Sequence, residues 1–211
     1  QKGVNEVILL ISIHHIASDG WSMRVLLQDL SNIYSDILTF GRSKSEALPM
    51  QYSDYAKWQY QFMKSPEYSN QLTYWKEEMK GAPPALELPI DKEKTDVIEN
   101  VGKRLIFEID QEVTSKLKTI CKENNCTLYM LLMSAFSTLM HRYSNQEDIV
   151  LGTLIANRNQ AELEKMIGFF VNTLPIRLNV EADMPFTALL EQVKDKTLQM
   201  YDHQDVPFDA L

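Results

Sequence analysis

The chain has 211 residues, of which 45% are hydrophobic and 24% are charged. This is an ordinary composition for a globular protein with one large domain or two small lobes. The net charge is −8, and the 21 basic residues are scattered among 29 acidic ones. A nucleic-acid surface needs clustered Lys and Arg, and a bilayer span needs about 20 apolar residues, so neither partner is expected. We expect a cytoplasmic protein.

In the first part of the chain, the apolar run Glu6–His14 predicts a strand that is buried on both faces. Apolar residues at helical spacing from Met23 to Leu38 predict a helix, with Asp19 or Ser22 as its N-cap. Two further amphipathic helices are predicted over 52–62 and 67–80.

The charged stretch Pro89–Gly102 lacks periodicity and is expected to connect two lobes. Alternation over Lys103–Asp110 then predicts a strand. The remaining predicted elements are helices over 111–124 and 128–143, strands over 148–155 and 170–178, and a helix over 185–201. We expect the helix over 128–143 to be buried, because it is apolar on most sides. Strands that alternate with helices indicate an α/β architecture.

The two cysteines are Cys121 and Cys126. Their spacing is not C-x-x-C, and no nearby histidine completes a set of metal ligands. We therefore expect two reduced thiols.

The segment 14–22, HHIASDGWS, lies between the first predicted strand and the first predicted helix. Imidazole exchanges a proton well near neutral pH. On a strand, His14 and His15 are expected to point to opposite faces, one toward a cleft and one inward. The two rings could therefore not easily bind the same metal ion. Asp19 is expected to hold the turn by pairing with an arginine. Gly20 is expected to permit a backbone conformation that a Cβ disfavours, and to let a substrate approach closely.

Alone, an H-x-x-x-D spacing more often belongs to packed, hydrogen-bonded side chains than to a site, and a metal set is a further alternative. The longer string resembles the H-H-x-x-x-D-G signature of condensation domains in nonribosomal peptide synthetases, which belong to the chloramphenicol-acetyltransferase-like superfamily. Four later segments resemble that family's motifs in the expected order: 52–58 (YSDYAKW), 152–158 (GTLIANR), 167–174 (IGFFVNTL) and 203–209 (HQDVPFD). Leu154 replaces the usual Pro, and Asp209 replaces the usual Glu.

The resemblance covers essentially the whole chain and implies a two-lobed α/β fold of which both ends are missing here. Residues 1–95 would be the remainder of the N-terminal lobe, and residues 96–211 most of the C-terminal lobe. It implies that His15 is the catalytic residue. The residues implied to surround it are His14, Asp19, Gly20 and Arg158 as structural residues, with Arg158 as the partner of Asp19, and Trp21, Ser22 and Asn172 as candidates for lining a substrate tunnel. No bound metal or cofactor is implied.

The resemblance also implies amide bond formation between a donor acyl or peptidyl thioester and an acceptor aminoacyl thioester. Both substrates would be carried on the 4′-phosphopantetheine arms of upstream and downstream peptidyl carrier domains, next to an adenylation domain. His15 would act as a general base or would orient the amine. The incomplete domain is expected to be inactive alone and to self-associate through exposed apolar surface.

Two alternatives stay open. One is an ester-forming or epimerising relative with the same signature. The other is a non-catalytic recruitment module of the same fold. Such modules usually lose the second histidine or the glycine of the signature, whereas His15 and Gly20 are both present here.

Overall fold

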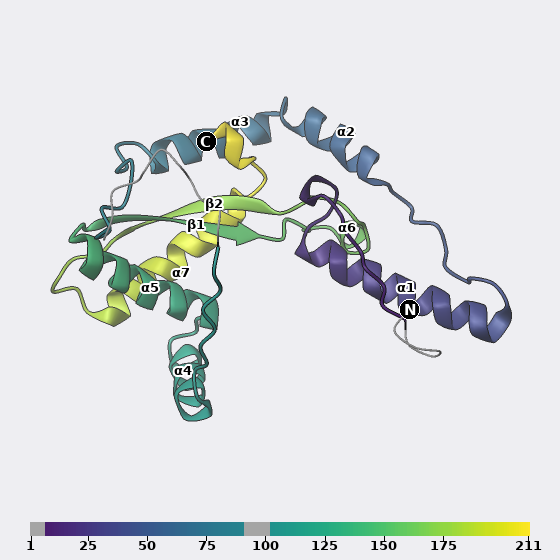
Figure 1. Cartoon of the computed structure of the whole chain (residues 1–211). Coiled ribbons are helices and arrows are strands. Elements are labelled where there is room, and N and C mark those ends of the chain that lie inside the picture. Colours follow the sequence, from purple (N-terminus) through teal and green to yellow (C-terminus); the bar gives the residue numbers. More distant parts are fainter. Residues whose placement is uncertain (1–6, 91–101) are drawn as a thin grey trace. The chain divides into compact units, whose positions relative to one another are not determined.

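The structure is a computed structural model that describes residues 7–90 and 102–211. In chain order its elements are η1 (His15–Ala17), α1 (Gly20–Phe40), α2 (Tyr52–Phe62), α3 (Pro66–Glu78), α4 (Gln111–Glu123), α5 (Leu128–Ser144), β1 (Asp148–Ile155), α6 (Ala161–Glu164), β2 (Asn172–Asn179), α7 (Phe186–Asp202) and η2 (Phe208–Ala210) (Figure 1). Within the described ranges, no helix is both long enough and apolar enough to cross a membrane.

The long helices and both strands lie within a few residues of where hydrophobic spacing predicts them, which confirms those predictions. The α/β fold class is likewise confirmed. Asp19 is the N-cap of α1, one of the two residues proposed for that position. The short helix α6 was not predicted, because four residues are too few to show a helical period.

Two predicted strands are wrong for the residues that the structure describes. Neither Val7–His14 nor Lys103–Asp110 pairs as a strand. Their apolar side chains are largely exposed, at 87% for Leu10 and 79% for Phe107. A suitable sequence pattern does not make a strand, because the backbone N–H and C=O groups also need a neighbouring strand. Glu6 and residues 91–101, most of the predicted connector, lie outside the described residues.

The chain forms two compact units, and both are discontinuous in sequence. One unit contains Gln1–Leu72, Leu154–Thr173 and Gln204–Leu211, and the other contains Thr73–Thr153 and Leu174–His203. None of the boundaries between the two units falls at residue 95. The division into lobes at that residue concerns the complete domain and stays a prediction.

The strands β1 and β2, most of whose residues belong to the second unit, form a two-stranded sheet. The Val180 N–H donates to the Glu147 carbonyl at 2.8 Å, so the end of β2 lies beside the start of β1 and the strands are antiparallel. Side chains from α4, α5, β1, β2 and α7 share one hydrophobic core, which includes Leu131, Ile149 and Val193. The expected burial of α5 is only partly correct, because one side of this helix is open and Phe136 is 48% exposed.

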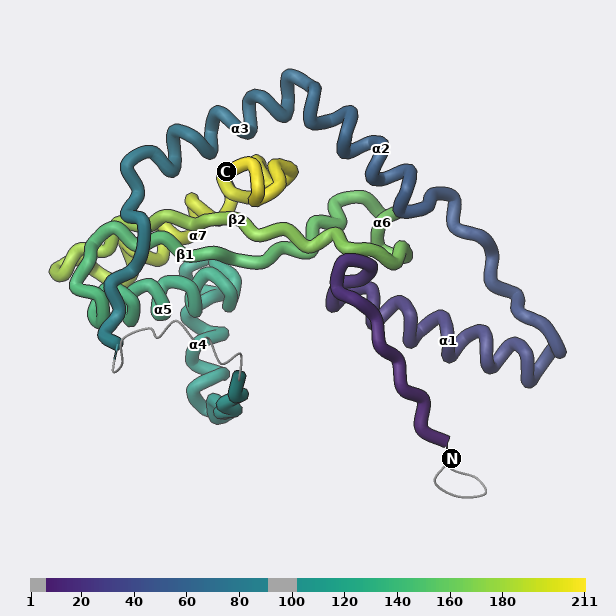
Figure 2. Tube along the Cα trace, turned by 45° about the horizontal axis from the view of Figure 1, so that its top comes forward, coloured from purple at the N-terminus to yellow at the C-terminus, as the bar shows by residue number. Residues whose placement is uncertain are grey.

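In the first unit, the start of α1 lies beside α6, as both the ribbon and the Cα tube show (Figures 1 and 2). A small core formed by Tyr55, Leu163, Met166 and Phe170 joins α2 to the segment that contains α6. The signature segment 14–22 therefore lies next to residues that come much later in the sequence.

Candidate active site

The two signature histidines are not on a strand. The chain turns into η1 at His15, and the Ile16 N–H donates to Nδ1 of His14 at 3.1 Å, so His14 is the N-cap of η1. Both histidine side chains are exposed. The expectation that strand alternation sends one ring to a cleft and buries the other is therefore wrong, because a tight turn replaces the strand at this position.

The His15 ring contacts the Phe169 ring edge to face, with centroids 5.4 Å apart and planes at 79°. Such a contact favours one ring orientation without occupying either nitrogen. Within residues 7–90 and 102–211, neither ring nitrogen of His15 has a hydrogen-bond partner in the structure, and no group of three His, Cys, Asp or Glu side chains could hold a metal ion. The ring is thus available to an incoming polar group. The sequence did not predict a role for Phe169.

Asp19 is buried, and besides its contact with Arg158 it accepts hydrogen bonds from Ser22 and Phe170. The N–H and Oγ of Ser22 donate to Oδ1 at 2.8 and 2.7 Å, and the Phe170 N–H donates to Oδ2 at 3.1 Å. Burial raises the pKa of Asp19, but these hydrogen bonds and the charge of Arg158 outweigh it, so the net pKa lies below its ordinary value. Asp19 is therefore ionised at neutral pH.

Arg158 is the ionic partner of Asp19, as expected from the sequence, with Nη2 3.2 Å from Oδ1. The Arg158 side chain is only 1% exposed. Its Nη2 also donates to Ser22 Oγ at 2.9 Å, and its Nη1 donates to the carbonyls of Leu163 and Met166. The guanidinium group therefore joins the first turn of α1 to the carbonyls in and just after α6.

Ser22 lies at the centre of this network and has no exposed surface. Its hydroxyl lies 2.8 Å from the Gly168 carbonyl, to which it can donate in place of Asp19, and it accepts from the Gly168 N–H at 3.1 Å. A side chain so placed cannot line a substrate tunnel in this conformation. The tunnel role expected for Ser22 is therefore corrected to a role in holding the network.

Gly20 is the first residue of α1, and its backbone is not in the left-handed region. A Cβ added there would meet nothing within 4 Å. The expected conformational reason for this glycine is therefore wrong. The other expectation, that its small size lets a substrate approach, fits the open space and stays a prediction.

Gly168 is the glycine for which packing leaves no room. An added Cβ would lie 2.5 Å from Cε2 of Tyr52, closer still to Cδ2, and 2.9 Å from the Phe170 ring. The Tyr52 hydroxyl donates to the Phe169 carbonyl at 2.9 Å, which hinders the ring from moving aside.

We expect Gly168→Ala to lower the free energy of unfolding by about 1–3 kcal/mol, the usual cost of overpacking. Urea denaturation of the purified protein measures it. Gly20→Ala is the matched control and should leave the unfolding free energy within about 0.5 kcal/mol of the wild type, as for surface substitutions. Equal stability of the two variants would contradict this account of Gly168.

Trp21 packs at the same junction. Its indole N–H donates to the Glu164 carbonyl at 2.8 Å, and the Arg24 guanidinium lies 4.2 Å from its ring centroid. Trp21 and Arg24 line an open pocket of about 400 Å³ on this face of α1. A tunnel role for Trp21 stays a prediction, and in the described residues Trp21 anchors α1 to the end of α6.

Asn172 has hydrogen bonds at both ends of its amide. Its Nδ2 donates to the carbonyls of Gln204 and Val206 at 3.1 and 2.8 Å, and its Oδ1 accepts from the N–H groups of Thr173 and Phe208 at 3.0 and 3.2 Å. Asn172 therefore fastens the 203–209 motif to the start of β2, a link that no sequence pattern indicates.

A pocket of about 290 Å³ opens beside Asn172. Tyr52, Tyr55 and Phe169 are among its lining residues. Burial raises the pKa of Tyr55 to about 12, so its phenol stays neutral. Phe169 also contacts the His15 ring, so the same side chain lines this pocket and lies against His15.

Gln71 is a residue of this unit that the sequence does not single out. Its Nε2 donates to Asp205 Oδ2 at 2.9 Å, and its Oε1 accepts from the Asp205 N–H at 3.1 Å. This paired contact ties the middle of α3 to the 203–209 motif. No spacing or motif marks Gln71, so only the structure could identify it.

Comparison with known proteins extends these observations. A family model described as "Condensation domain" matches residues 1–211. A linear gramicidin synthase of Brevibacillus parabrevis is 40% identical over 211 residues, which are 100% of this chain and 4% of that protein. Bacitracin synthase 3 of Bacillus licheniformis is 41% identical over 206 residues, which are 98% of this chain and 3% of that protein.

Solved structures agree with these matches. The X-domain from teicoplanin biosynthesis is 26% identical, with a TM-score of 0.84 over 93% of this chain and 45% of that one. A four-domain nonribosomal peptide synthetase bound to AMP and glycine is 28% identical, with a TM-score of 0.77 over 93% of this chain and 14% of that one. The chain thus spans less than half of the solved X-domain. It belongs to the condensation-domain family of nonribosomal peptide synthetases and covers part of the full domain.

Proposed function

We propose that the chain is the central part of a domain that joins a donor acyl or peptidyl thioester to an acceptor aminoacyl thioester through an amide bond. The observation that carries this proposal is the exposed imidazole of His15. Its ring nitrogens are free of hydrogen bonds among the described residues. The residue follows an apolar segment and comes shortly before Asp19, which forms a buried ion pair with Arg158. The second histidine and the glycine of the family signature are both present.

The amine of the acceptor attacks the thioester carbon, an amide forms, and the thiol of the donor's arm leaves. An ammonium group has no lone pair with which to attack, so its proton must be held or removed. His15 is proposed to take this proton as a general base, or to orient the amine and stabilise the charged intermediate. The edge-to-face contact with Phe169 would keep the imidazole in one orientation.

We propose that Asp19, Arg158 and Ser22 hold His15 in position and do not contact the substrate themselves. All three are buried and bonded to one another. His14 caps η1 and would fix the backbone just before the catalytic residue. The roles of Trp21 and Asn172 in lining a tunnel are also proposals.

The partners proposed for the complete protein are an upstream and a downstream peptidyl carrier domain, whose 4′-phosphopantetheine arms bear the two substrates, and a neighbouring adenylation domain. Two observations support this. The curated relatives are long synthases of which this chain spans only 4% or 3%. The similar four-domain synthetase was solved with AMP and glycine.

A recruitment module is the second candidate function. The observation that favours it is the similarity to the X-domain. A structure of the X-domain in a complex with OxyB is also similar to this chain, with a TM-score of 0.83. The intact His15 and Gly20 favour catalysis over recruitment.

The decisive experiment uses the complete domain that contains this chain, with one carrier domain loaded with an acyl donor and a second loaded with an aminoacyl acceptor. Mass spectrometry of the acceptor arm should detect the amide product. An ester product, an epimerised donor without condensation, or a bound partner protein without any product would each overturn the proposal in favour of the corresponding alternative.

A further inference from the structure

Cys121 and Cys126 lie at the C-terminal end of α4, in the second unit. Asn124 caps this helix, and Asn125 follows with a φ of 49°, in the left-handed region. The Cys126 N–H donates to the Cys121 carbonyl at 3.0 Å, and the Asn125 N–H donates to the Lys122 carbonyl at 3.4 Å. These two hydrogen bonds define a Schellman motif.

In a Schellman motif the side chains of the residues at these two positions usually make an apolar contact across the turn. Here the side chains at both positions, Cys121 and Cys126, are thiols. Both belong to the core shared by α4, α5 and α7, with Cys121 buried and Cys126 half-buried. One backbone hydrogen bond between two residues also keeps their Cα atoms near the separation of roughly 4.4–6.8 Å that disulfides require.

We propose that Cys121 and Cys126 are an oxidisable thiol pair that closes into an intramolecular disulfide when a small-molecule disulfide such as oxidised glutathione reacts with it. The Cys126 thiolate attacks one sulfur of oxidised glutathione, and one glutathione thiolate leaves. The Cys121 thiolate then attacks the Cys126 sulfur and expels the glutathione held there. Two protein thiols lose two electrons and two protons, and one glutathione disulfide is reduced to two thiols.

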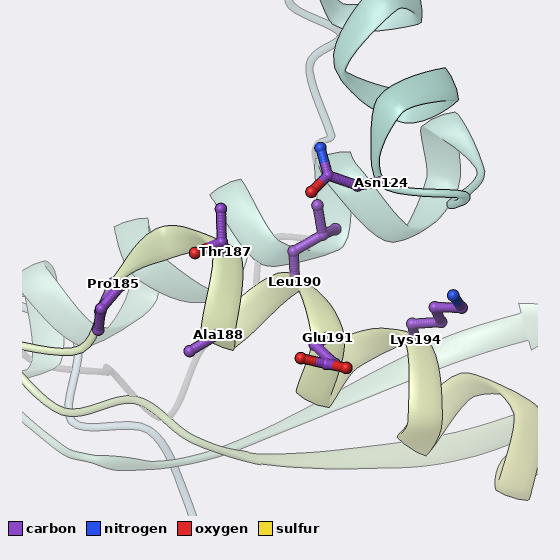
Figure 3. Close-up of a pocket in the computed structure, with 7 residues that line it drawn as sticks. All are labelled: Asn124, Pro185, Thr187, Ala188, Leu190, Glu191 and Lys194. Carbon is purple, nitrogen blue, oxygen red and sulfur yellow. The ribbon is translucent and has the colours of Figure 1, made fainter.

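Cys126 is the residue that reacts first, because it is the more accessible of the two. A pocket of about 330 Å³ lies beside the turn and is lined by Asn124 and Lys194. In Figure 3, Asn124 at the end of α4 and Leu190 of α7 point toward each other, and Lys194 projects from the same helix as Leu190. The positive charge of Lys194 acts on the Cys126 thiol, and it would attract an anionic disulfide to this side of the turn.

Burial and the neighbouring Cys121 thiol raise the pKa of Cys126, and Lys194 opposes this only in part. The thiolate fraction at neutral pH is therefore small, and the reaction should be followed over hours. The disulfide would tie the end of α4 to the residue just before Thr127, the N-cap of α5.

The test incubates the purified 211-residue chain with oxidised glutathione and measures intact mass and cross-linked peptides. The wild type should lose roughly two mass units and yield a peptide that links Cys121 to Cys126. The Cys121→Ser variant should stop at one glutathione on Cys126, and the Cys126→Ser variant should remain unmodified. Thermal melts confirm that each variant is folded, and Cys121→Ala replaces the serine variant if it is not.

Three results would overturn the proposal. One is a wild type that keeps glutathione without closing. Another is a disulfide between two chains instead of within one. The third is folded wild type that stays reduced while urea-unfolded protein reacts.

Discussion

Replacing His15 by alanine in the complete condensation domain should slow amide formation by about 10²–10⁴-fold, the usual contribution of a general acid–base group. The melting temperature should stay near that of the wild type. His15 is exposed, and its ring contact is with Phe169, which is itself 40% exposed. The measurement is a single-turnover assay with two loaded carrier domains, so that product release does not mask the chemical step.

A second substitution separates the two proposed roles of His15. His15→Gln keeps a hydrogen-bonding side chain but cannot take up a proton near neutral pH. A rate as low as that of the alanine variant indicates proton transfer, and a rate much closer to the wild type indicates orientation of the amine. If His15→Ala itself forms product at nearly the wild-type rate, the catalytic assignment is wrong.

Arg158→Met should lower the free energy of unfolding of the same domain by about 3–5 kcal/mol, the cost of leaving one member of a buried ion pair without its partner. The Asp19 carboxylate would keep its bonds to Ser22 and Phe170 but lose the cation that faces it. The carbonyls of Leu163 and Met166 would also lose their donor. Urea denaturation measures the change.

Arg177→Met is the matched control. Arg177 has the same kinds of partner, an aspartate at 2.7 Å and two backbone carbonyls, but its side chain is 23% exposed. Water can therefore replace the lost contacts, and the expected loss is about 1 kcal/mol. The double variant Asp19→Asn/Arg158→Met should lose less free energy of unfolding than the two single variants added together. The reason is that it leaves no buried charge without a partner. Equal losses for Arg158→Met and Arg177→Met would contradict the importance of burial.

Sequence patterns predicted the helices well, because their periodic apolar faces are a local property of the chain. They failed at Val7–His14 and Lys103–Asp110, where the pattern suits a strand but pairing depends on a neighbour that the sequence does not specify. The error at His14 and His15 has the same origin, since alternation was assumed on a strand that is absent.

At the candidate site, the motifs identified Asp19 and Arg158, and their ion pair is present. They could not show that Ser22 is buried between the two, that Gly168 has no room for a side chain, or that Phe169 meets the His15 ring. These facts depend on how α1 packs against a segment far along the chain, and a single sequence carries no record of such packing.

The ion pair between Asp19 and Arg158 also sets the order in which this part of the protein can be assembled. The two residues are 139 positions apart in sequence. At a ribosomal rate of about 5–20 residues per second, Arg158 is synthesised roughly 7–28 s after Asp19. During that interval α1 and the histidine turn have neither their buried cation nor the N–H groups of Gly168 and Phe170. The contacts that surround His15 can therefore form only after the segment 158–170 has been synthesised, although the histidine itself is made early.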